Sequence, residues 1–246
     1  MMKKLLSLVA VLAMTLGLTA TITSTAQAET KWSMKSPFAR EVVRPGDVDK
    51  DTYNIEHVYE LQYRLKWAGV FTATPNGVFG PQTERAVKQF QKRLGYKRTG
   101  IVGHRLWKSL IKRTVRGKAA VPEACKNTGW HACYDRKRHQ VNLYRGGTLL
   151  NSWLVRGGDY NMKTRTGTFQ VQWRDIDHTS HTYGGAPMPY SQFFSGGQAL
   201  HGSRFMMDPF EGHSHGCVNF FVEDARQLWN MTFDKLLWVH VYGAWD

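Results

Sequence analysis

The sequence predicts a multidomain protein in which a small three-helix N-terminal bundle precedes a mainly-β domain. Between residues 52 and 113, apolar residues recur at spacings of three and four, which is the period of an amphipathic helix. After residue 125 they alternate with polar residues between glycine-rich connections, as in half-buried strands. The 246 residues are 42% hydrophobic and 13% aromatic, so the chain can bury one or two ordinary cores and is globular.

The first 28 residues are predicted to be an export signal. Lys3 and Lys4 precede an apolar run that ends near Leu18, and the small residues of 26-AQA-28 suit a cleavage site. An uncleaved membrane anchor is the alternative, but the run is short for a span of about 20 apolar residues. Residues 29–51 would then be an N-terminal extension of the mature chain, with no stable membrane insertion after cleavage.

Residues 52–113 are predicted to contain three short helices. Their apolar positions are Ile55, Val58, Leu61 and Leu65 in the first, Thr83, Ala86, Val87, Phe90 and Leu94 in the second, and Leu106, Trp107, Leu110 and Ile111 in the third. Glycines mark the gaps between the helices, and Pro81 suits the first turn of the second helix.

A linker is predicted over residues 114–124, because 114-TVRGKAAVPEA-124 has no apolar period and contains glycine and proline. Residues 125–246 form the mainly-β part. The turn 145-RGGT-148 predicts a hairpin, and the alternation of Phe169, Val171 and Trp173 predicts a half-buried strand. A helix is expected over 222–231 and a last strand over 236–242.

The charge of the chain predicts a polyanionic partner. The formal net charge is +14, and removal of Lys3 and Lys4 with the signal leaves 31 basic and 19 acidic residues. Nucleic acid is a common partner of proteins with a large positive charge. An exported protein meets anionic wall polymers first, so we expect these and not nucleic acid. Solubility alone is the alternative explanation of the charge.

Three cysteines in an exported chain suggest one pair and one free thiol. Cys125 and Cys133 flank a segment with Asn, Gly and Trp that suits a turn, and we predict a disulfide between them over two free thiols. Cys217 would then remain reduced. A free thiol in an exported protein is more often reactive than structural.

The stretch 213-HSHGCVNFF-221 has the residue types that a reactive thiol requires. A cysteine attacks a carbonyl as thiolate and needs a neighbouring base, which histidine usually supplies. The glycine before it lets the backbone turn so that consecutive N–H groups converge on an oxyanion. Zinc ligation is the alternative. His201, His213, His215 and Cys217 are suitable ligands, and the last three would point the same way along an extended strand.

Residues 52–113 resemble the small three-helix peptidoglycan-binding domain that is often appended to wall enzymes. The resemblance depends on Leu61-Gln62, Leu65, Gly69, 76-NGVFGPQTERAVKQFQ-91, Gly95, 99-TGIVG-103 and Trp107. It implies peptidoglycan as a partner. The turn at 76–79 and the nearby Tyr63 and Trp67 are the expected glycan contacts.

The segment 199-ALHGSRFMMDPFEGHSHGCVN-219 resembles the catalytic signature of the L,D-transpeptidases. The resemblance extends to 141-VNLYRGGTLLNSWLVRGG-158, 164-TRTGTFQV-171 and 187-PMPYSQFF-194, and covers most of residues 130–243. It implies a β-sandwich-like catalytic domain with one or two helices. It also implies acyl transfer by a cysteine on peptidoglycan stem peptides, no metal or cofactor, and acylation by carbapenems.

Carried over by position, this resemblance assigns Cys217 as nucleophile and His201 as general base, with the backbone carbonyl of Gly202 orienting the ring. His215 and Gly216 lie in the signature loop, and the N–H groups of Gly216 and Cys217 are the expected oxyanion donors. The expected substrate contacts are Tyr190, which matches a position bordering the donor pocket, Ser214 in the signature loop, and Asn219, where many members carry arginine.

Several charged residues near the signature have open roles. His213 lies outside its core and is expected to be solvated or to support the loop, and a catalytic role is the alternative. His178 and His181 are lid contacts or plain surface. Arg165, Arg174 and Arg204 either read stem carboxylates or form an ordinary charged face.

The resemblance implies an exported cell-wall enzyme that joins two stems through their third residues and releases D-alanine. An L,D-carboxypeptidase, with water as acceptor, is the nearest alternative. A zinc-dependent wall hydrolase and a non-catalytic wall-binding protein are the others. A papain-like peptidase is disfavoured because His201 precedes Cys217 in the chain.

Overall fold

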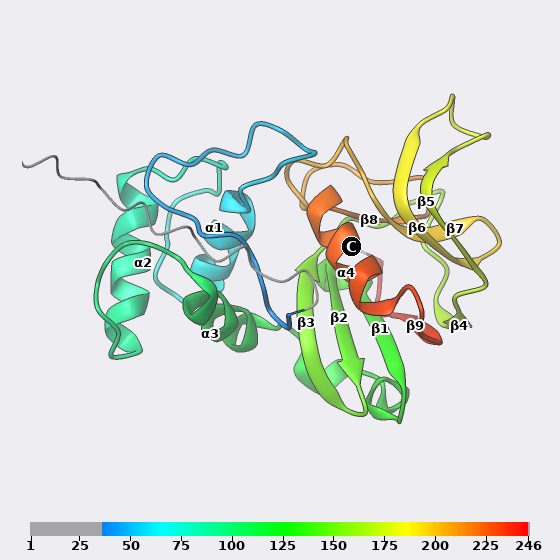
Figure 1. The fold of residues 1–246 in the computed structure, drawn as a ribbon, viewed down its shortest axis with the longest axis horizontal. Helices are drawn as coiled ribbons and strands as arrows, with labels where there is room; N and C mark the ends of the chain where they lie inside the picture. The colour runs from blue at the N-terminus through cyan, green and yellow to red at the C-terminus, as the bar shows by residue number, and fades with distance from the viewer. Residues whose placement is uncertain (1–35, 246) are drawn as a thin grey trace, which may run out of the picture. The chain divides into compact units, whose positions relative to one another are not determined.

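The computed structural model describes residues 36–245, and the predicted export signal lies outside them. Within this range the chain forms four α-helices and nine β-strands (Figure 1). The elements are α1 (Val58–Trp67), α2 (Pro81–Arg93), α3 (His104–Thr114), β1 (Trp130–Asp135), β2 (Gln140–Arg145), β3 (Thr148–Leu154), β4 (Gly167–Gln170), β5 (Trp173–Thr179), β6 (Pro187–Ser195), β7 (Gln198–Gly202), β8 (Val218–Phe220), α4 (Val222–Thr232) and β9 (Leu237–Tyr242). None of these helices is long and apolar enough to cross a membrane.

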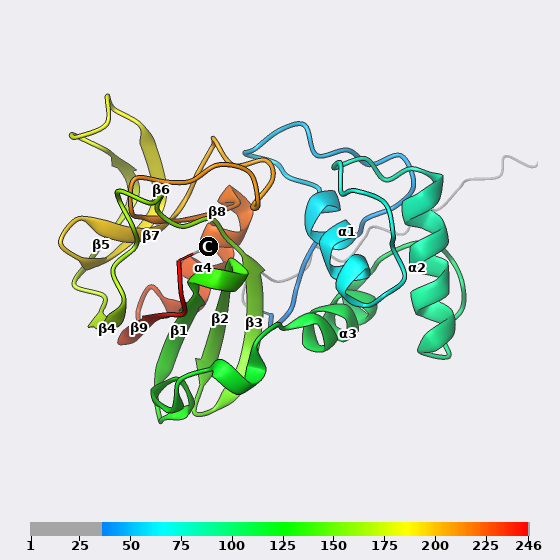
Figure 2. The same ribbon diagram turned by 180° about the vertical axis from the view of Figure 1, so that it is seen from behind.

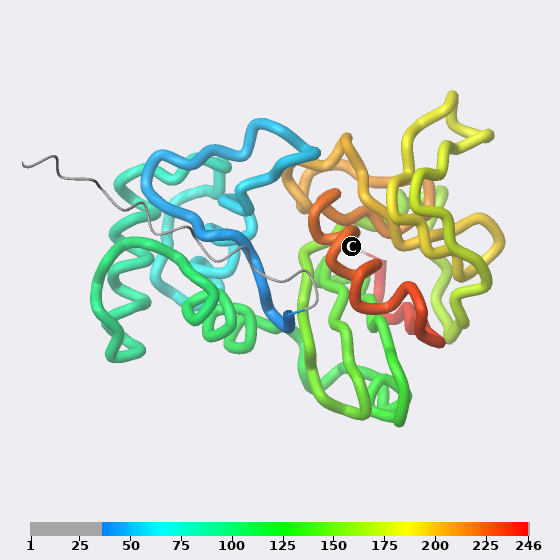
Figure 3. The backbone as a smooth tube through the Cα atoms, viewed as in Figure 1, coloured from blue at the N-terminus to red at the C-terminus, as the bar shows by residue number. Residues whose placement is uncertain are grey.

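Helices α1, α2 and α3 share an apolar core in which Trp107 and Leu110 are fully buried. The segment that precedes α1 adds to this core. Val43 and Val48 pair with residues of the two glycine turns, and Phe38 is buried among the helices. Figure 3 traces this segment, in blue, from the neighbourhood of β3 to the start of α1. Residues 36–51, the described part of the N-terminal extension, are therefore packed against the helices.

The first helix begins at Val58 and does not include Ile55, contrary to the sequence prediction. The carboxylate of Asp49 accepts hydrogen bonds from the backbone N–H groups of Val58 and Tyr59, at 3.1 and 2.7 Å, and so caps the helix from the extension. His57 adopts a left-handed backbone conformation with φ of 52°. This turns the chain before the helix, so Ile55 packs elsewhere.

Two buried glutamines fix the glycine turns of the first domain. The Gln62 side chain accepts from the N–H groups of Asn76 and Gly77 and donates to the Val78 carbonyl. Gln91 likewise accepts from the N–H of Gly100 and donates to a carbonyl of the same turn. These two motif glutamines therefore satisfy buried backbone groups, which is a folding role.

The predicted linker is a packed connection in the structure. Thr114 ends α3, and its hydroxyl accepts a hydrogen bond from Arg64 of α1 at 3.1 Å. The backbone N–H of Arg116 donates to the Gln140 side chain on β2, and the Arg116 guanidinium lies 4.8 Å from the centre of the Trp67 ring. A segment without apolar periodicity can still be ordered by polar contacts of this kind.

The strands form two sheets, of order β3-β2-β1-β9-β4 and β5-β6-β7-β8. Figure 2 shows β1, β2 and β3 in front of α4. Ala225, Leu228 and Met231 of α4 join a core made with residues of both sheets. Strands β1 and β9 are parallel neighbours, although they come from opposite ends of the domain. This architecture is consistent with the β-rich fold that the resemblance implies.

The predicted hairpin forms between β2 and β3, but the predicted strand over Phe169–Trp173 is broken. Val171 lies between β4 of one sheet and β5 of the other. Its N–H donates to the Leu237 carbonyl of β9, whereas the next N–H, of Gln172, donates to Phe193 of β6. Alternation of apolar residues continues through such a crossing, so the pattern does not reveal it.

Candidate active site

Two neighbouring parallel strands, β7 and β8, place His201 and Cys217. His201 is on β7, and Cys217 directly precedes β8, where Asn219 is the register partner of His201. Both residues line a pocket of about 220 Å³. The 213–217 turn and the connection between β5 and β6 complete the pocket walls.

The ring of buried His201 has a fixed orientation. Its Nδ1 atom lies 2.8 Å from the carbonyl oxygen of Gly202. A carbonyl oxygen only accepts hydrogen bonds, so Nδ1 carries the proton and Nε2 keeps a free lone pair in the neutral ring. Burial lowers the pKa of His201 to about 4, and the charge of His178 lowers it further, whereas the hydrogen bond to Gly202 and a side-chain hydrogen bond with Asn219 act in the opposite direction. The imidazole is therefore neutral at neutral pH and able to accept a proton.

Burial raises the pKa of the Cys217 thiol, which differs from the lowered value that a preformed thiolate needs. The Ala199 backbone N–H and the charge of Arg165 act in the opposite direction. The thiol also points to the Gly197 carbonyl, with Sγ and O 3.8 Å apart. The resting pair is thus a neutral thiol and a neutral imidazole, and the thiol needs a base at the time of reaction.

Residues 213–217 form a turn, not the extended strand on which the zinc alternative depends. Gly216 has φ of 116°, and a Cβ atom there would lie 2.5 Å from Nε2 of Gln198. Glycine is therefore favoured by the conformation, and a larger residue would also have to displace the Gln198 side chain. Within the described residues, the groups with at least three donor atoms close enough for a metal are Cys125, Cys133 and His240, and His57, Glu60 and Asp224. The four zinc candidates do not form such a group.

Ser214 fixes the turn around the thiol. Its hydroxyl donates to the Cys217 carbonyl at 2.6 Å and accepts from the Gly216 N–H at 3.1 Å. Ser214 is nearly buried, so it serves the loop in the unliganded site although it also borders the pocket. The Gly216 N–H, an expected oxyanion donor, is engaged by this hydroxyl.

Of the two other predicted substrate residues, one lies at the pocket and one does not. Asn219 lines the pocket, and its Oδ1 atom is buried without a hydrogen-bond partner. Tyr190 does not line it. This residue has a left-handed φ of 59°, and its ring lies 6.3 Å from that of Trp229 on α4. Its neighbours Met188 and Pro187 are at the pocket instead. The reversed backbone at Tyr190 is not detectable in the sequence pattern.

The open charged candidates have mostly structural contacts. Arg165 donates to the turn between β6 and β7, and Arg174 donates to the carbonyls of Thr232, the last residue of α4, and Lys235. Arg204 stacks on the ring of Phe205. His178 packs against Phe193, away from the pocket lining, whereas His213 is part of that lining. His181 stays near His178.

Several residues of the pocket were not predicted from the sequence, and Tyr183, Phe205 and Arg156 are the main ones. Tyr183, on the loop between β5 and β6, stacks on His215 with ring centres 4.3 Å apart. Phe205 is 60% exposed at the pocket. Arg156 is 8% exposed and donates from its two terminal nitrogens to the carbonyls of Phe205 and Glu211, at 2.9 and 2.6 Å. Only the glycines near Tyr183 gave a sign of a loop there.

The first domain has a separate groove. Its volume is about 420 Å³, and Gln62, Asn76, Val78, Gln82 and Arg85 are among its lining residues. The turn expected to contact glycan thus borders a cavity. Tyr63 and Trp67, the other expected contacts, lie elsewhere, because both rings pack near Phe210 of the β7–β8 connection.

The structure joins Cys125 to Cys133 by a disulfide, with Cα atoms 6.2 Å apart, and leaves Cys217 as a free thiol. Both paired cysteines are fully buried beside Val121 and Tyr144. The bridge fixes the middle of β1 to the segment before it.

Comparison with known proteins gives two family matches. Residues 54–110 match the putative peptidoglycan binding domain family PG_binding_1, and residues 129–240 match the YkuD family, described as L,D-transpeptidase catalytic domain. Two spore cortex-lytic enzymes from Bacillus cereus are each 34% identical over 82 residues, which is 33% of this chain and 29% of theirs. The chain thus matches less than a third of the length of these relatives.

This chain is also similar to solved structures. An L,D-transpeptidase (Yku) from Stackebrandtia nassauensis is 24% identical, with a TM-score of 0.52 over 85% of this chain and 98% of that chain, which shows a shared fold. An L,D-transpeptidase from Xylanimonas cellulosilytica is also 24% identical, with a TM-score of 0.47 over 83% of this chain and 98% of that chain. The chain therefore carries an L,D-transpeptidase catalytic domain of the YkuD family behind a domain of the putative peptidoglycan-binding family.

Proposed function

We propose that this protein is an exported cell-wall enzyme that forms 3-3 cross-links in peptidoglycan with Cys217 as nucleophile. The observation that carries the proposal is the pocket that Cys217 shares with a neutral His201 whose Nδ1 is held by Gly202. Because its pKa is lowered to about 4, His201 is unprotonated at neutral pH, so it can act as general base if the thiol proton moves to it while the sulfur attacks the carbonyl. The matched catalytic family supports the same chemistry.

In the first half-reaction, His201 takes the Cys217 proton as the sulfur attacks the carbonyl carbon of the third residue of a tetrapeptide stem. The carbonyl oxygen becomes an oxyanion, for which the Cys217 and Gly216 N–H groups are the nearest candidates in the turn. The Gly216 N–H must leave the Ser214 hydroxyl to act. The bond to the fourth residue then breaks, and D-alanine leaves with the proton from His201. A thioester remains.

In the second half-reaction, a side-chain amine of a neighbouring stem attacks the thioester. His201 accepts a proton from the amine and returns one to the departing sulfur, so an amide forms and the thiol is restored. Water as acceptor would give an L,D-carboxypeptidase on the same stems. Asn219, with its unpaired Oδ1 in the pocket, is our candidate for a hydrogen bond to the stem backbone.

The first domain is proposed to hold the enzyme on peptidoglycan through the groove beside Asn76 and Arg85. Binding there would raise the local concentration of stems. Such a substrate implies an extracytoplasmic location, in agreement with the predicted export signal. It also fits a disulfide between Cys125 and Cys133, since disulfides persist in oxidising compartments.

Anionic wall polymers are the second proposed partner. Residues 85–122 hold twelve of the 33 Lys and Arg residues and none of the 19 Asp and Glu residues, so the rest of the chain is nearly balanced. Ten of the twelve are exposed and define the basic surface: Arg85, Lys92, Arg93, Lys97, Arg98, Arg105, Lys108, Lys112, Arg113 and Lys118. Solubility alone would not require the charge to gather in one segment.

The test is intact-mass measurement with and without imipenem, on the native chain and on Cys217→Ser. A stoichiometric adduct is expected on the native chain and none on Cys217→Ser. His201→Ala should nearly abolish adduct formation at neutral pH, whereas His213→Ala should not. An adduct on Cys217→Ser, or none on the native chain, contradicts the proposal.

A product assay separates the remaining alternatives. Incubation with a disaccharide-tetrapeptide should give a 3-3 linked dimer by mass spectrometry, and exclusive formation of the tripeptide would identify a carboxypeptidase. Activity that is lost with a chelator would indicate the zinc hydrolase. A native chain without adduct or product would be a wall-binding protein.

A further inference from the structure

The connection between β7 and β8 forms one wall of the pocket and also contacts the first domain. Residues 203–212, which we name the bridging loop, contribute Ser203 and the exposed ring of Phe205 to the pocket. The loop connects the strand that carries His201 to the turn that carries Cys217. In Figure 3 it runs beside the segment that precedes α1.

The catalytic domain supports the loop at its two ends through Arg156. The guanidinium donates to the carbonyls of Phe205 and Glu211, near the first and last residues of the loop. The backbone of Arg156 is itself paired with Asn219, at 2.9 and 2.8 Å. Arg156 therefore fixes the two loop ends relative to β8, and the charge of Asp208 in the middle of the loop also acts on it.

The middle of the loop is supported by α1 of the first domain. The Tyr63 hydroxyl lies 3.1 and 2.9 Å from the two carboxylate oxygens of Asp208, which is 7% exposed. Burial and this carboxylate raise the pKa of Tyr63, so the hydroxyl stays protonated and donates. The ring of Tyr63 also lies 4.4 Å from that of Phe210.

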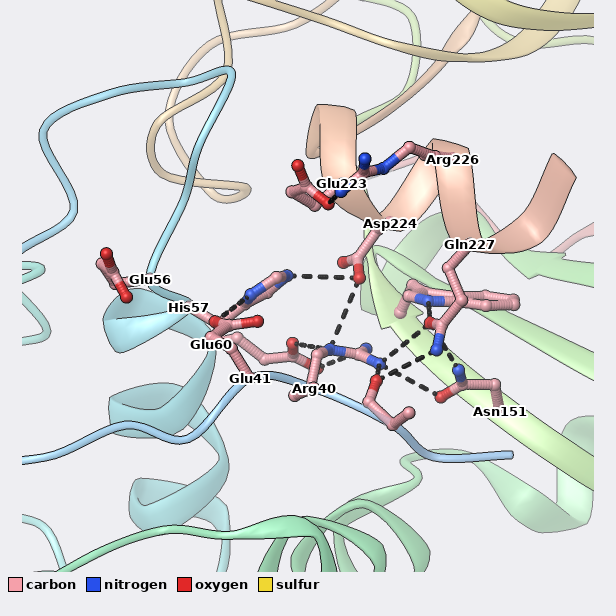
Figure 4. A network of polar contacts seen from close by, with 12 residues as sticks. Arg40, Glu41, Glu56, His57, Glu60, Asn151, Glu223, Asp224, Arg226 and Gln227 are labelled. Carbon is pink, nitrogen blue, oxygen red and sulfur yellow. Dashed lines mark hydrogen bonds and ion pairs between the residues drawn. The ribbon is translucent and has the colours of Figure 1, made fainter. Parts of the chain in front are cut away.

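A third contact fixes the loop from the segment before α1. Met206 is fully buried in a cluster with Ile55 and Phe221, the residue before α4. Beneath this cluster, Arg40 binds Glu60 of α1 and Asp224 of α4, and His57 lies between Glu41 and Asp224 (Figure 4). This buried network holds α1 against α4, so the support under the loop is rigid.

We infer that α1 shapes the substrate pocket, and that Tyr63 is a positioning residue which acts through Asp208 and Phe210 on the wall formed by Phe205. The inference rests on the proposed function. A positioning role of Tyr63 differs from a tethering role of the first domain, because a tether affects only substrates that the first domain can bind. A positioning role affects soluble substrates as well. It should alter binding in the pocket more than the chemical step, because neither His201 nor Cys217 lies on the loop.

The test compares Tyr63→Phe with Tyr96→Phe in the full chain. Tyr96 also carries a hydrogen-bonded hydroxyl in the first domain, 3.2 Å from Ser109, but it has no contact with the loop. With a soluble disaccharide-tetrapeptide, Tyr63→Phe should raise KM about three- to tenfold with little change in kcat or in its pH profile. Tyr96→Phe should leave both constants unchanged.

Two further measurements separate positioning from tethering. Tyr63→Phe should bind isolated sacculi like the native chain, whereas Asn76→Ala in the groove should bind them more weakly and keep a native KM for the soluble substrate. Amide hydrogen exchange of residues 204–212 should become faster in Tyr63→Phe and, more strongly, in Phe210→Ala.

A native KM in Tyr63→Phe overturns the inference, and so does an equal shift in Tyr96→Phe, since the change would then follow domain stability. If the native chain forms neither product nor imipenem adduct, the proposed function has failed instead. Hydrogen exchange at 204–212 still decides in that case whether α1 holds the loop.

Discussion

The Nδ1 atom of His201 donates to the carbonyl oxygen of Gly202, its own neighbour in the chain, at 2.8 Å. This contact selects the tautomer whose Nε2 is free. The acceptor is a neutral backbone carbonyl and not a carboxylate. Burial is the main reason that the pKa of His201 falls to about 4, and the charge of His178 adds to it.

The acid limit of the reaction should follow this pKa. We expect the rate constant for acylation by imipenem to stay nearly level from about pH 7 to about pH 5 and to fall as the pH drops through about 4. Below that value His201 is protonated and cannot accept the thiol proton. Stopped reactions at each pH, followed by intact mass, measure the profile, and circular dichroism verifies the fold. A midpoint near the ordinary value of about 6.5 would contradict the assignment.

The Ser214 hydroxyl should matter for rate although it does not react. Ser214→Ala removes the bonds to the Cys217 carbonyl and the Gly216 N–H, and so releases the turn. We expect about a tenfold slower acylation and a loss of about 1–2 kcal/mol in unfolding free energy. Ser109→Ala, which removes a hydroxyl from the first domain, is the matched control. Native acylation kinetics in Ser214→Ala would show that the turn is fixed by its backbone alone.

Arg40 should be a major contributor to stability. Its side chain is fully buried, at 2.7 Å from Glu60 and 3.4 Å from Asp224, and Arg40→Met would leave these carboxylates buried with fewer cationic partners. We expect a loss of about 3–5 kcal/mol in urea unfolding. Lys88→Met is the control, because its pair with Glu84 is partly exposed and should contribute less than about 1 kcal/mol. Equal losses for both variants would exclude a special role of the buried network.

The basic surface should bind polyanions in a salt-dependent way. We expect Lys97→Glu, Arg98→Glu and Lys108→Glu together to weaken retention on an anionic wall-polymer column and to reduce the dependence on salt. The control changes Lys50, Lys66 and Lys137 to Glu, which removes the same charge from exposed positions outside that surface. If both triple variants lose retention equally, binding to the polymer depends on the net charge of the protein and not on the basic surface. Imipenem acylation should be unchanged in each.

Local patterns predicted the elements whose partners are near in sequence. Periodicity located the helices over residues 83–94 and 106–111 and the helix after Phe221, and the glycine turn located the β2–β3 hairpin. The crossing at Val171 was not predictable, since its two partners, Leu237 and Phe193, belong to distant strands. The parallel pairing of β1 with β9 was not predictable for the same reason, since the two strands are distant in the sequence. Contacts between distant segments leave no period in the sequence.

The candidate site shows the same limit. The pattern around Cys217 and His201 directed attention to residues that the structure brings to one pocket. It gave no sign of Arg156, whose importance depends on two backbone carbonyls some fifty residues later in the chain. It also suggested Tyr63 as a glycan contact, because an aromatic residue on a short helix does not reveal which surface it meets.

The ion pair between Arg40 and Asp224 restricts which first domains can replace the native one, by engineering or in evolution. Domains of wall enzymes are often considered interchangeable modules. Here a foreign first domain without an equivalent of Arg40 would leave the buried Asp224 of α4 with one cationic neighbour fewer. A chimaera would need a neutral residue at position 224 as well. Recombination at the 114–124 junction alone should therefore give unstable proteins, and the two halves of the chain are expected to be inherited together.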